Sequence, residues 1–305
     1  KERGLYGFFD DFDHLIEGVS SAGTATDIGY APWSETGDAG GEVLLIDGVG
    51  GQMTLNTDAD DNDEFYFYRT RETFLFAQDR PMYWEARLKY SEAATNAANI
   101  IVGVVDAAGA NTLLDDGGGP KASYSGMVLF KEDGQTNWSF ETSLAGSQDT
   151  TRTETVAASS DFVTVGALWL PETSTQGIGV PKIDTGGGAN LVQMRDNTDN
   201  SGQFKNISHR FTYTSATEMT FVIGIKNGSG NAELVPVDYA GAWQARFYEP
   251  IGDPPRRQGP SAGRVTFRQD GHSRLHLRLA GRRNSQKARQ GGRTMSLRRL
   301  VGKSF

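Results

Sequence analysis

The sequence predicts an all-β protein that folds as a two-sheet antiparallel jelly-roll sandwich, and three observations lead to this fold class. About a dozen segments alternate apolar and polar residues with the period of two that half-buried strands require. The chain has 38 glycines, and Asn-Gly or Asp-Gly pairs separate these segments, as tight hairpins demand. Before residue 250 no long stretch carries the apolar stripe of a helix, and no repeat indicates a propeller or solenoid.

The predicted strands follow one another along the chain with turns between them. Their ranges are 42–47, 52–57, 64–70, 82–90, 99–106, 125–132, 137–142, 164–170, 209–214, 219–225 and 235–247. Range 82–90 shows the pattern most clearly, because Met82, Trp84 and Leu88 alternate with Glu85 and Arg87. The segment NIIVGVVD at 99–106 is apolar on both faces, which predicts a central strand that is covered on each side.

Tryptophans inside alternating strands are expected in the core, and these are Trp84, Trp138 and Trp243. In the last strand the alternation places Val235, Val237, Tyr239 and Trp243 on one face. Trp33, in the segment YAPWSE, lies outside any predicted strand. We therefore expect Trp33 to be exposed, and it is our candidate contact for a glycan or a protein partner.

Two regions interrupt the alternation. Residues 171–206 are polar and glycine-rich, which indicates either an extended functional loop or strands too irregular to assign. Residues 249–263, EPIGDPPRRQGPSAG, have the prolines and glycines of a linker. The predicted organisation is a jelly-roll domain over residues 1–248, a linker over 249–263 and an irregular, Arg-rich tail over 264–305.

Charge is distributed unevenly along the chain. The net charge is −8, but residues 251–305 hold 12 Arg and two Lys against two Asp, a net charge of +12, so the first 250 residues carry −20. No cysteine is present, which excludes disulfides, thiolate metal sites and thiol catalysis. No apolar run has the length that crosses a bilayer, so we expect no membrane partner.

The basic tail allows three interpretations. Its most clustered arginines are Arg282, Arg283, Arg298 and Arg299. Such residues neutralise nucleic-acid phosphates, or they dock on an acidic surface such as the −20 domain of a neighbouring copy. Alternatively, the segment is a non-native reading frame. The sequence leaves these interpretations open, and nucleic acid is the partner that we expect least.

An acidic segment, NTDADDNDE at 56–64, runs into the aromatic strand at 64–70. Its carboxylates, which suit a hard cation such as Ca²⁺, are Asp58, Asp60, Asp61, Asp63 and Glu64. Counted as an EF-hand from Asp58, the segment has Asp63 where glycine is required and Arg69 where glutamate is required. It therefore predicts either a weak structural Ca²⁺ site or an acidic, solvated turn, and we expect no other cofactor.

We expect no catalytic residue. Glycoside hydrolysis needs two carboxyls about 5–10 Å apart that face one cleft. Sandwich glucanases place them in a Glu-x-Asp-x-x-Glu strand, a spacing that this sequence lacks. Glu85 stands alone in its strand, and the four histidines are too sparse for a zinc site or a Ser-His-Asp triad.

Several phrases of the sequence resemble a group of tailed-bacteriophage virion proteins, and together they cover most of residues 7–247. They include FFDDFDHL, LLIDGVGGQMTLNTDADDNDEFYF, GMVLFKEDGQTNWSFET and FTYTSATEMTFVIGIKNGSGNAELVPVDYAGAWQAR. Members of this group are similar to laminin-G and concanavalin A-like jelly rolls. The resemblance implies a decoration or cement role on the capsid and no catalytic residue. Segment 171–206 and the Arg-rich end depart from the pattern.

We therefore expect a non-enzymatic virion protein at the capsid surface that binds and stabilises the capsid exterior. Its partners would be the phage major capsid protein and further copies of this chain, as a homo-oligomer or as an array on the capsid lattice. Hairpin loops and one sheet edge would bridge capsid subunits, and multivalency on the lattice would amplify weak contacts. The first alternative is a virion-displayed carbohydrate-binding module for host attachment, and the second is a glycoside hydrolase-like sandwich.

Overall fold

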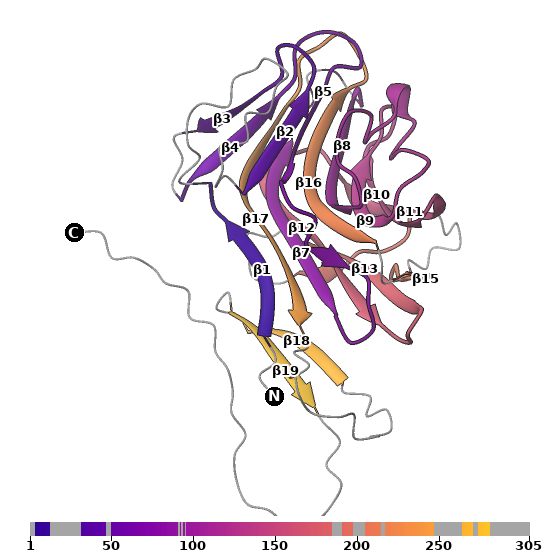
Figure 1. Cartoon of the computed structure of the whole chain (residues 1–305). Coiled ribbons are helices and arrows are strands. Elements are labelled where there is room, and N and C mark those ends of the chain that lie inside the picture. Colours follow the sequence, from indigo (N-terminus) through magenta and orange to yellow (C-terminus); the bar gives the residue numbers. More distant parts are fainter. Residues whose placement is uncertain are drawn as a thin grey trace, which may run out of the picture.

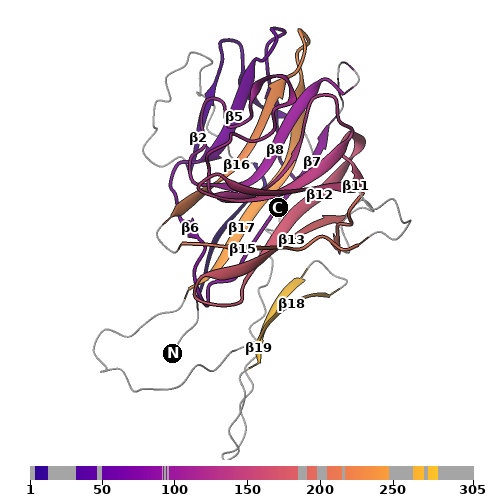
Figure 2. The same cartoon turned by 90° about the vertical axis from the view of Figure 1, so that its right-hand side faces the viewer.

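The computed structural model describes residues 4–12, 32–46, 50–90, 92, 94, 96–184, 191–197, 205–214 and 217–246, and the backbone of 264–270 and 274–280. Within these residues two antiparallel sheets pack face to face, which confirms the predicted all-β sandwich (Figures 1 and 2). The one helical element in the described part is a short 3₁₀ turn, Asp115–Gly117. The described residues include no helix of the length and apolarity that a bilayer crossing needs.

Sheet A has nine described strands in the order β14–β13–β12–β7–β17–β4–β3, with β1 paired to β17 and β15 paired to β13. Their bounds are β1 (Gly4–Asp10), β3 (Glu42–Ile46), β4 (Gln52–Asn56), β7 (Met82–Tyr90), β12 (Ser159–Pro171), β13 (Gln176–Asp184), β14 (Val192–Gln193), β15 (His209–Thr212) and β17 (Leu234–Arg246). All pairs are antiparallel, and β7 and β17 form the centre of the sheet. Strand β3 is one edge of this sheet (Figure 1).

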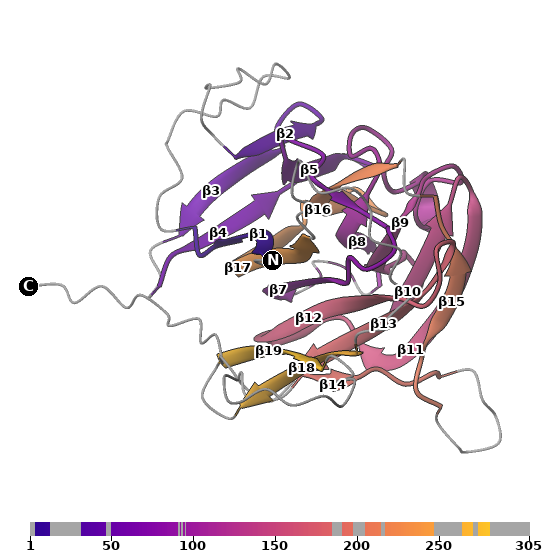
Figure 3. The ribbon, with the colours of Figure 1, turned by 60° about the horizontal axis from the view of Figure 1, so that its bottom comes forward.

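Sheet B has eight described strands in the order β11–β10–β9–β8–β16–β5–β2, with β6 paired to β16. Their bounds are β2 (Trp33–Gly37), β5 (Glu64–Arg69), β6 (Phe74–Leu75), β8 (Ala98–Val105), β9 (Gly126–Lys131), β10 (Asn137–Leu144), β11 (Ser147–Val156) and β16 (Glu218–Asn227). Figure 3 shows the two layers, with β12, β7 and β17 in one and β9, β8 and β16 in the other. The main core fills the space between them.

The central strand β8 is buried along its whole length, as its two-faced apolar sequence predicts. Ile100, Val102 and Val104 belong to the core between the sheets. Ile101 and Val105 point the other way, into a second apolar cluster on the outer face of sheet B. That cluster includes residues of the segment 106–125, so this long connection covers the outer face of sheet B.

Segment 171–206 contains regular strands although its composition is polar and glycine-rich. Strand β13 covers 176–184 and pairs with β12 over eight residues, and β14 follows at 192–193. The first two inner-face positions of β13 are Gly177 and Gly179, and Pro181 and Ile183 follow them. A Cβ at Gly177 would lie 2.5 Å from the Trp169 indole nitrogen, and one at Gly179 would lie 3.0 Å from the Thr142 side chain. Large neighbours fill the core here, so an apolar alternation is missing from the strand.

A β-bulge in β17 overturns the predicted position of Trp243. The pairing with β7 shifts register between Val237 and Tyr239, so one extra residue, Asp238, enters the strand. Val235 and Val237 face the core as predicted, but after the bulge Ala240 and Ala242 take the core positions. Tyr239 and Trp243 are therefore turned to the outer face of sheet A. Trp84 and Trp138 are completely buried, which confirms their predicted place in the core.

The described backbone of the C-terminal tail is more regular than expected. Strands β18 (Arg264–Asp270) and β19 (Arg274–Ala280) pair antiparallel in a separate two-stranded sheet. The weak alternation between residues 273 and 279 corresponds to β19. The predicted linker 249–263 and the arginines at 282, 283, 298 and 299 lie outside the described residues.

Candidate functional site

The outer face of sheet A brings aromatic and charged side chains together from strands that are distant in the sequence. Strand β1 pairs with β17, and β17 pairs with β7, so residues near 9, 84 and 241 become neighbours (Figure 3). We define the outer-face site as Phe9, Tyr83, Glu85, Tyr239 and Trp243. Because all five come from paired strands of one sheet, the backbone holds them at fixed spacing.

The strand register places these residues in rows across the sheet. In one row Tyr83 lies directly opposite Trp243. In the next row Glu85 lies between two glycines, Gly166 of β12 on one side and Gly241 of β17 on the other. Neither residue directly opposite Glu85 therefore has a side chain of its own.

The aromatic rings of the site pack on one another. The Trp243 ring stacks on Tyr83 with ring centres 5.8 Å apart and an interplanar angle of 13°. Phe9 lies 5.3 Å from Tyr239 and 6.4 Å from Trp243, ring centre to ring centre. Phe9 remains 49% exposed, so part of this aromatic surface faces solvent. Such rings offer a large rigid contact area at small entropic cost.

Gly241 is required by the position of the tryptophan ring. A Cβ at residue 241 would come within 2.4 Å of the Trp243 indole, so a side chain there would displace the ring. The ring therefore leans over residue 241, along the strand towards the row of Glu85.

The Glu85 carboxylate lies in a poorly hydrated environment. Burial raises the pKa of Glu85, and the hydrogen bond that the Tyr83 hydroxyl donates to its Oε2 offsets only part of this rise. Burial and the Glu85 charge raise the pKa of Tyr239 to about 12. Glu85 is thus a hydrogen-bond acceptor flanked by two tyrosines that stay protonated at neutral pH.

A polar row borders the site on its other side. Arg87 forms an ion pair with Asp238, the bulge residue of β17. The Arg87 guanidinium also lies 4.8 Å from the centre of the Phe162 ring. Thr164 and Tyr239 share a hydrogen bond of 3.3 Å. The stacked rings of Tyr83 and Trp243 therefore lie on one side of Glu85, and the Arg87–Asp238 ion pair lies on the other side.

Sequence reasoning did not find this site. The alternation of 82–90 correctly places Glu85 and Arg87 on the face away from the core, but Tyr239 and Trp243 were expected in the core. The available signal was the segment VDYAGAW at 237–243, in which Asp238 and Gly241 interrupt an otherwise apolar strand. A bulge at that point predicts the reversal of faces.

The structure contradicts the expectation that Trp33 is exposed. Trp33 begins β2 and is only 7% exposed. Its ring stacks on Phe67 at 4.6 Å with an interplanar angle of 11°, and its indole N–H donates a 2.8 Å hydrogen bond to Asp10 Oδ2. The segment YAPWSE was assigned to no strand because β2 is short and its partner β5 begins about 30 residues later. Trp33 is a core residue and not a contact surface.

The acidic segment at 58–64 divides into an exposed turn and a buried carboxylate. Asp58, Asp60 and Asp61 are exposed. Burial and the charges of Asp38, Asp60 and Asp58 raise the pKa of Asp63. No group of three or more His, Asp or Glu side chains in the described part of the chain is arranged to hold a metal ion. The weak Ca²⁺ site stays a prediction, and the effect of EDTA on the melting temperature tests it.

Glu64 has a different environment from the rest of the acidic segment. It is 5% exposed, and its Oε2 lies 3.0 Å from the ammonium of Lys226, which is itself buried. The same ammonium contacts Asp115 Oδ1 at 2.5 Å and Asn111 Oδ1 at 3.1 Å. The Lys226 ammonium is therefore the cation that pairs with Glu64. Its contacts with Asn111 and Asp115 also connect the segment 106–125 to sheet B.

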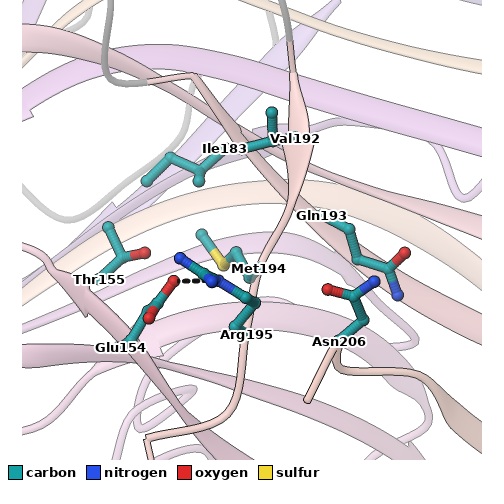
Figure 4. A pocket seen from close by; sticks show the side chains of 8 residues that line it. All are labelled: Glu154, Thr155, Ile183, Val192, Gln193, Met194, Arg195 and Asn206. Carbon is teal, nitrogen blue, oxygen red and sulfur yellow. Dashed lines mark hydrogen bonds and ion pairs between the residues drawn. The ribbon is translucent and has the colours of Figure 1, made fainter. Parts of the chain in front are cut away.

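A pocket of about 480 Å³ lies beside the paired strands β13 and β14 and strand β11 (Figure 4). Its lining residues are Glu154, Thr155, Ile183, Val192, Gln193, Met194, Arg195 and Asn206. The two charged residues of this lining, Glu154 and Arg195, form an ion pair of 2.6 Å with each other. Their charges offset one another, so the pocket attracts a charged ligand only weakly. The outer-face site is the stronger candidate.

Comparison with known proteins supports the fold and assigns no family. No protein-family model and no curated protein matches the chain. Among solved structures, peanut lectin with a nine-residue peptide superposes with a TM-score of 0.50 and 10% identity, over 80% of this chain and 100% of the lectin chain. An endo-1,3-β-glucanase from Streptomyces sioyaensis has a TM-score of 0.44 and 14% identity, over 79% and 96%. The likeness to peanut lectin agrees with the two-sheet jelly roll described above and shows the fold alone.

Proposed function

We propose that the chain is a non-enzymatic carbohydrate-binding protein whose ligand lies on the outer-face site of sheet A. The observation that carries this proposal is Glu85, placed between two glycines at the centre of the sheet and flanked by aromatic rings. The apolar face of a sugar ring packs on aromatic rings, and sugar hydroxyls donate hydrogen bonds to a carboxylate. The outer-face site offers both partners side by side.

The site also suits binding because it is rigid. Its side chains come from three paired strands, and the rings of Tyr83 and Trp243 are held by their stack. A preformed site loses little conformational entropy when the ligand binds.

Binding rather than cleavage is favoured by the number of available carboxylates. Glycoside hydrolysis needs two carboxyls that face the same bond. Glu85 is the carboxylate of the site, and the carboxylate of Asp238 in the bordering row is held by Arg87. We expect no release of reducing sugar from any glycan that the protein binds, measured over a long incubation.

Trp243→Ala tests the proposed site. We expect it to weaken binding at least about 30-fold, because central aromatic contacts commonly contribute 2 kcal/mol or more. The ligand is first selected on a glycan array with the wild-type chain, and its Kd is then measured by isothermal titration calorimetry. Val156→Ala is the control, since Val156 is exposed on sheet B, and it should leave the Kd unchanged. A silent array, or equal Kd values for Trp243→Ala and the wild type, would refute the proposal.

A second candidate function is capsid decoration on a phage particle, and the edge strand β3 favours it. Leu44 and Leu45 are each 42% exposed and Ile46 is 37% exposed. β3 ends the sheet, so its outer backbone groups lack a strand partner in the described part of the chain. An apolar edge strand without a central charge or proline readily accepts a strand from another chain. The partner that we propose is the major capsid protein, with this chain at the capsid surface.

Leu45→Lys tests capsid decoration. A charge in the middle of β3 opposes strand pairing, so the variant should bind particles more weakly and lower the temperature at which they leak DNA. Val192→Lys, on the short edge strand β14 at the other end of sheet A, is the control. Equal leakage temperatures for particles with and without the protein would exclude a stabilising role.

A further inference from the structure

We infer that the sugar recognised by the outer-face site carries a carboxylate, as a uronic or sialic acid does, and that Lys182 is the residue that binds this group. This inference rests on the proposed function and extends it to the class of ligand. The evidence comes from the row of residues that contains Glu85, which continues from β7 across β12 to β13.

The row continues from Glu85 across Gly166 to Lys182. Gly166 of β12 lies opposite Glu85 on one side and opposite Lys182 of β13 on the other. Lys182 faces outwards, because the residue before it, Pro181, is buried, and the one after it, Ile183, belongs to the core. Two strand spacings separate Glu85 and Lys182, which is about 10 Å between their Cα atoms. No side chain of the row stands between them.

The two charged groups do not neutralise each other. Glu85 accepts a hydrogen bond from Tyr83, and no ion pair joins it to a described cation. Within the described part of the chain, the Lys182 ammonium forms neither an ion pair nor a hydrogen bond. Burial lowers the pKa of Lys182 and raises that of Glu85, so both charges are incompletely solvated. A half-buried ammonium that has no counter-ion among the described residues favours a ligand that brings an anion.

A sugar acid can bind Glu85 and Lys182 at the same time. Its hydroxyls donate hydrogen bonds to Glu85, and its carboxylate pairs with the ammonium of Lys182. Charge-assisted hydrogen bonds of this kind are roughly twice as strong as those of a neutral hydroxyl. The row beside it supplies apolar contact, because Leu168 of β12 lies opposite Tyr83. A neutral sugar would leave the Lys182 ammonium with a weaker acceptor.

The test is a glycan array that carries neutral, uronate-containing and sialylated glycans, followed by calorimetry in 50 mM salt. For the best acidic glycan and its neutral counterpart of the same linkage, we expect at least tenfold tighter binding of the acid. Lys182→Met should remove this preference and leave the Kd for the neutral glycan within about twofold. Lys89→Met is the matched control, because Lys89 faces the same side near Phe162 and should change neither Kd. Raising the salt should reduce the preference.

The possible outcomes separate the inference from the proposed function. Binding of neutral glycans that equals or exceeds binding of acidic ones overturns the inference and leaves carbohydrate binding intact. A preference for acidic glycans that survives Lys182→Met overturns the role of Lys182. An array without any bound glycan refutes the proposed function, and the inference with it. Circular-dichroism melting curves for each variant show that losses of binding do not come from unfolding.

Discussion

Lys226→Met is expected to destabilise the fold by about 3–5 kcal/mol, because it leaves a buried carboxylate without its cation. The Lys226 ammonium lies 3.0 Å from Glu64 Oε2 and donates a 3.3 Å hydrogen bond to the carbonyl of Leu113. The backbone N–H of Asn111 donates a 2.7 Å hydrogen bond to the other oxygen of Glu64. Loss of the ammonium therefore also loosens the segment that covers sheet B. Urea unfolding at pH 7 measures the effect.

Two further variants isolate the electrostatic cause. Lys121→Met is the control within the same segment, because its ammonium donates to the exposed carbonyl of Ala107 and its loss should cost less than about 1 kcal/mol. Glu64→Gln added to Lys226→Met should recover part of the lost stability, since it removes the uncompensated charge. Equal losses for Lys226→Met and Lys121→Met would contradict the assigned role of the pair.

The pH dependence follows from the same contacts. Burial lowers the pKa of Lys226, but the hydrogen bonds and charges of Asp115 and Glu64 outweigh it, so the pKa lies above its ordinary value of 10.5. A raised lysine pKa contributes stability that is fully present below pH 10.5 and is lost as the pH rises through the folded-state value. The stability difference between the wild type and Lys226→Met should therefore narrow in strongly alkaline buffer.

Trp33→Ala is expected to cost about 3–5 kcal/mol of folding free energy and to leave glycan binding by the folded protein unchanged. The substitution removes the stack on Phe67, an edge contact to Phe8 at 5.4 Å, and the hydrogen bond to Asp10. A cavity in the core would remain. Chemical denaturation measures the loss, and calorimetry with the array-selected glycan below the melting temperature measures binding.

Trp33→Phe keeps an aromatic ring at the same place and should cost clearly less than Trp33→Ala. It also keeps the experiment informative if Trp33→Ala does not fold. Weaker glycan binding by folded Trp33→Phe would indicate that Trp33 belongs to the binding surface after all. A loss of less than 1 kcal/mol for Trp33→Ala would contradict its place in the core.

Local residue patterns were sufficient to predict the fold class and the position of most strands. The strand predicted at 82–90 matches β7, and the strand at 99–106 matches β8 within one residue. The physical reason is local. A strand with one buried face alternates apolar and polar residues, and a strand that is covered on both sides is apolar throughout. Either pattern can be recognised without knowledge of the partner strand.

The alternation of 82–90 places Glu85 on the outer face, but contacts between distant strands determined which residues join it there. The bulge at Asp238 reversed the faces of Tyr239 and Trp243, and pairing of β2 with β5 buried Trp33. Strand β13 lacks a clear apolar alternation because Gly177 and Gly179 take two of its inner positions, where the side chains of Trp169 and Thr142 leave no room for a larger residue. Each of these outcomes depends on a contact between residues far apart in the sequence, and residue periodicity carries no information about such contacts. The aromatic strand after the acidic turn could be predicted from its own residues. The pairing of Glu64 with Lys226 could not, because the two residues lie 162 positions apart in the sequence.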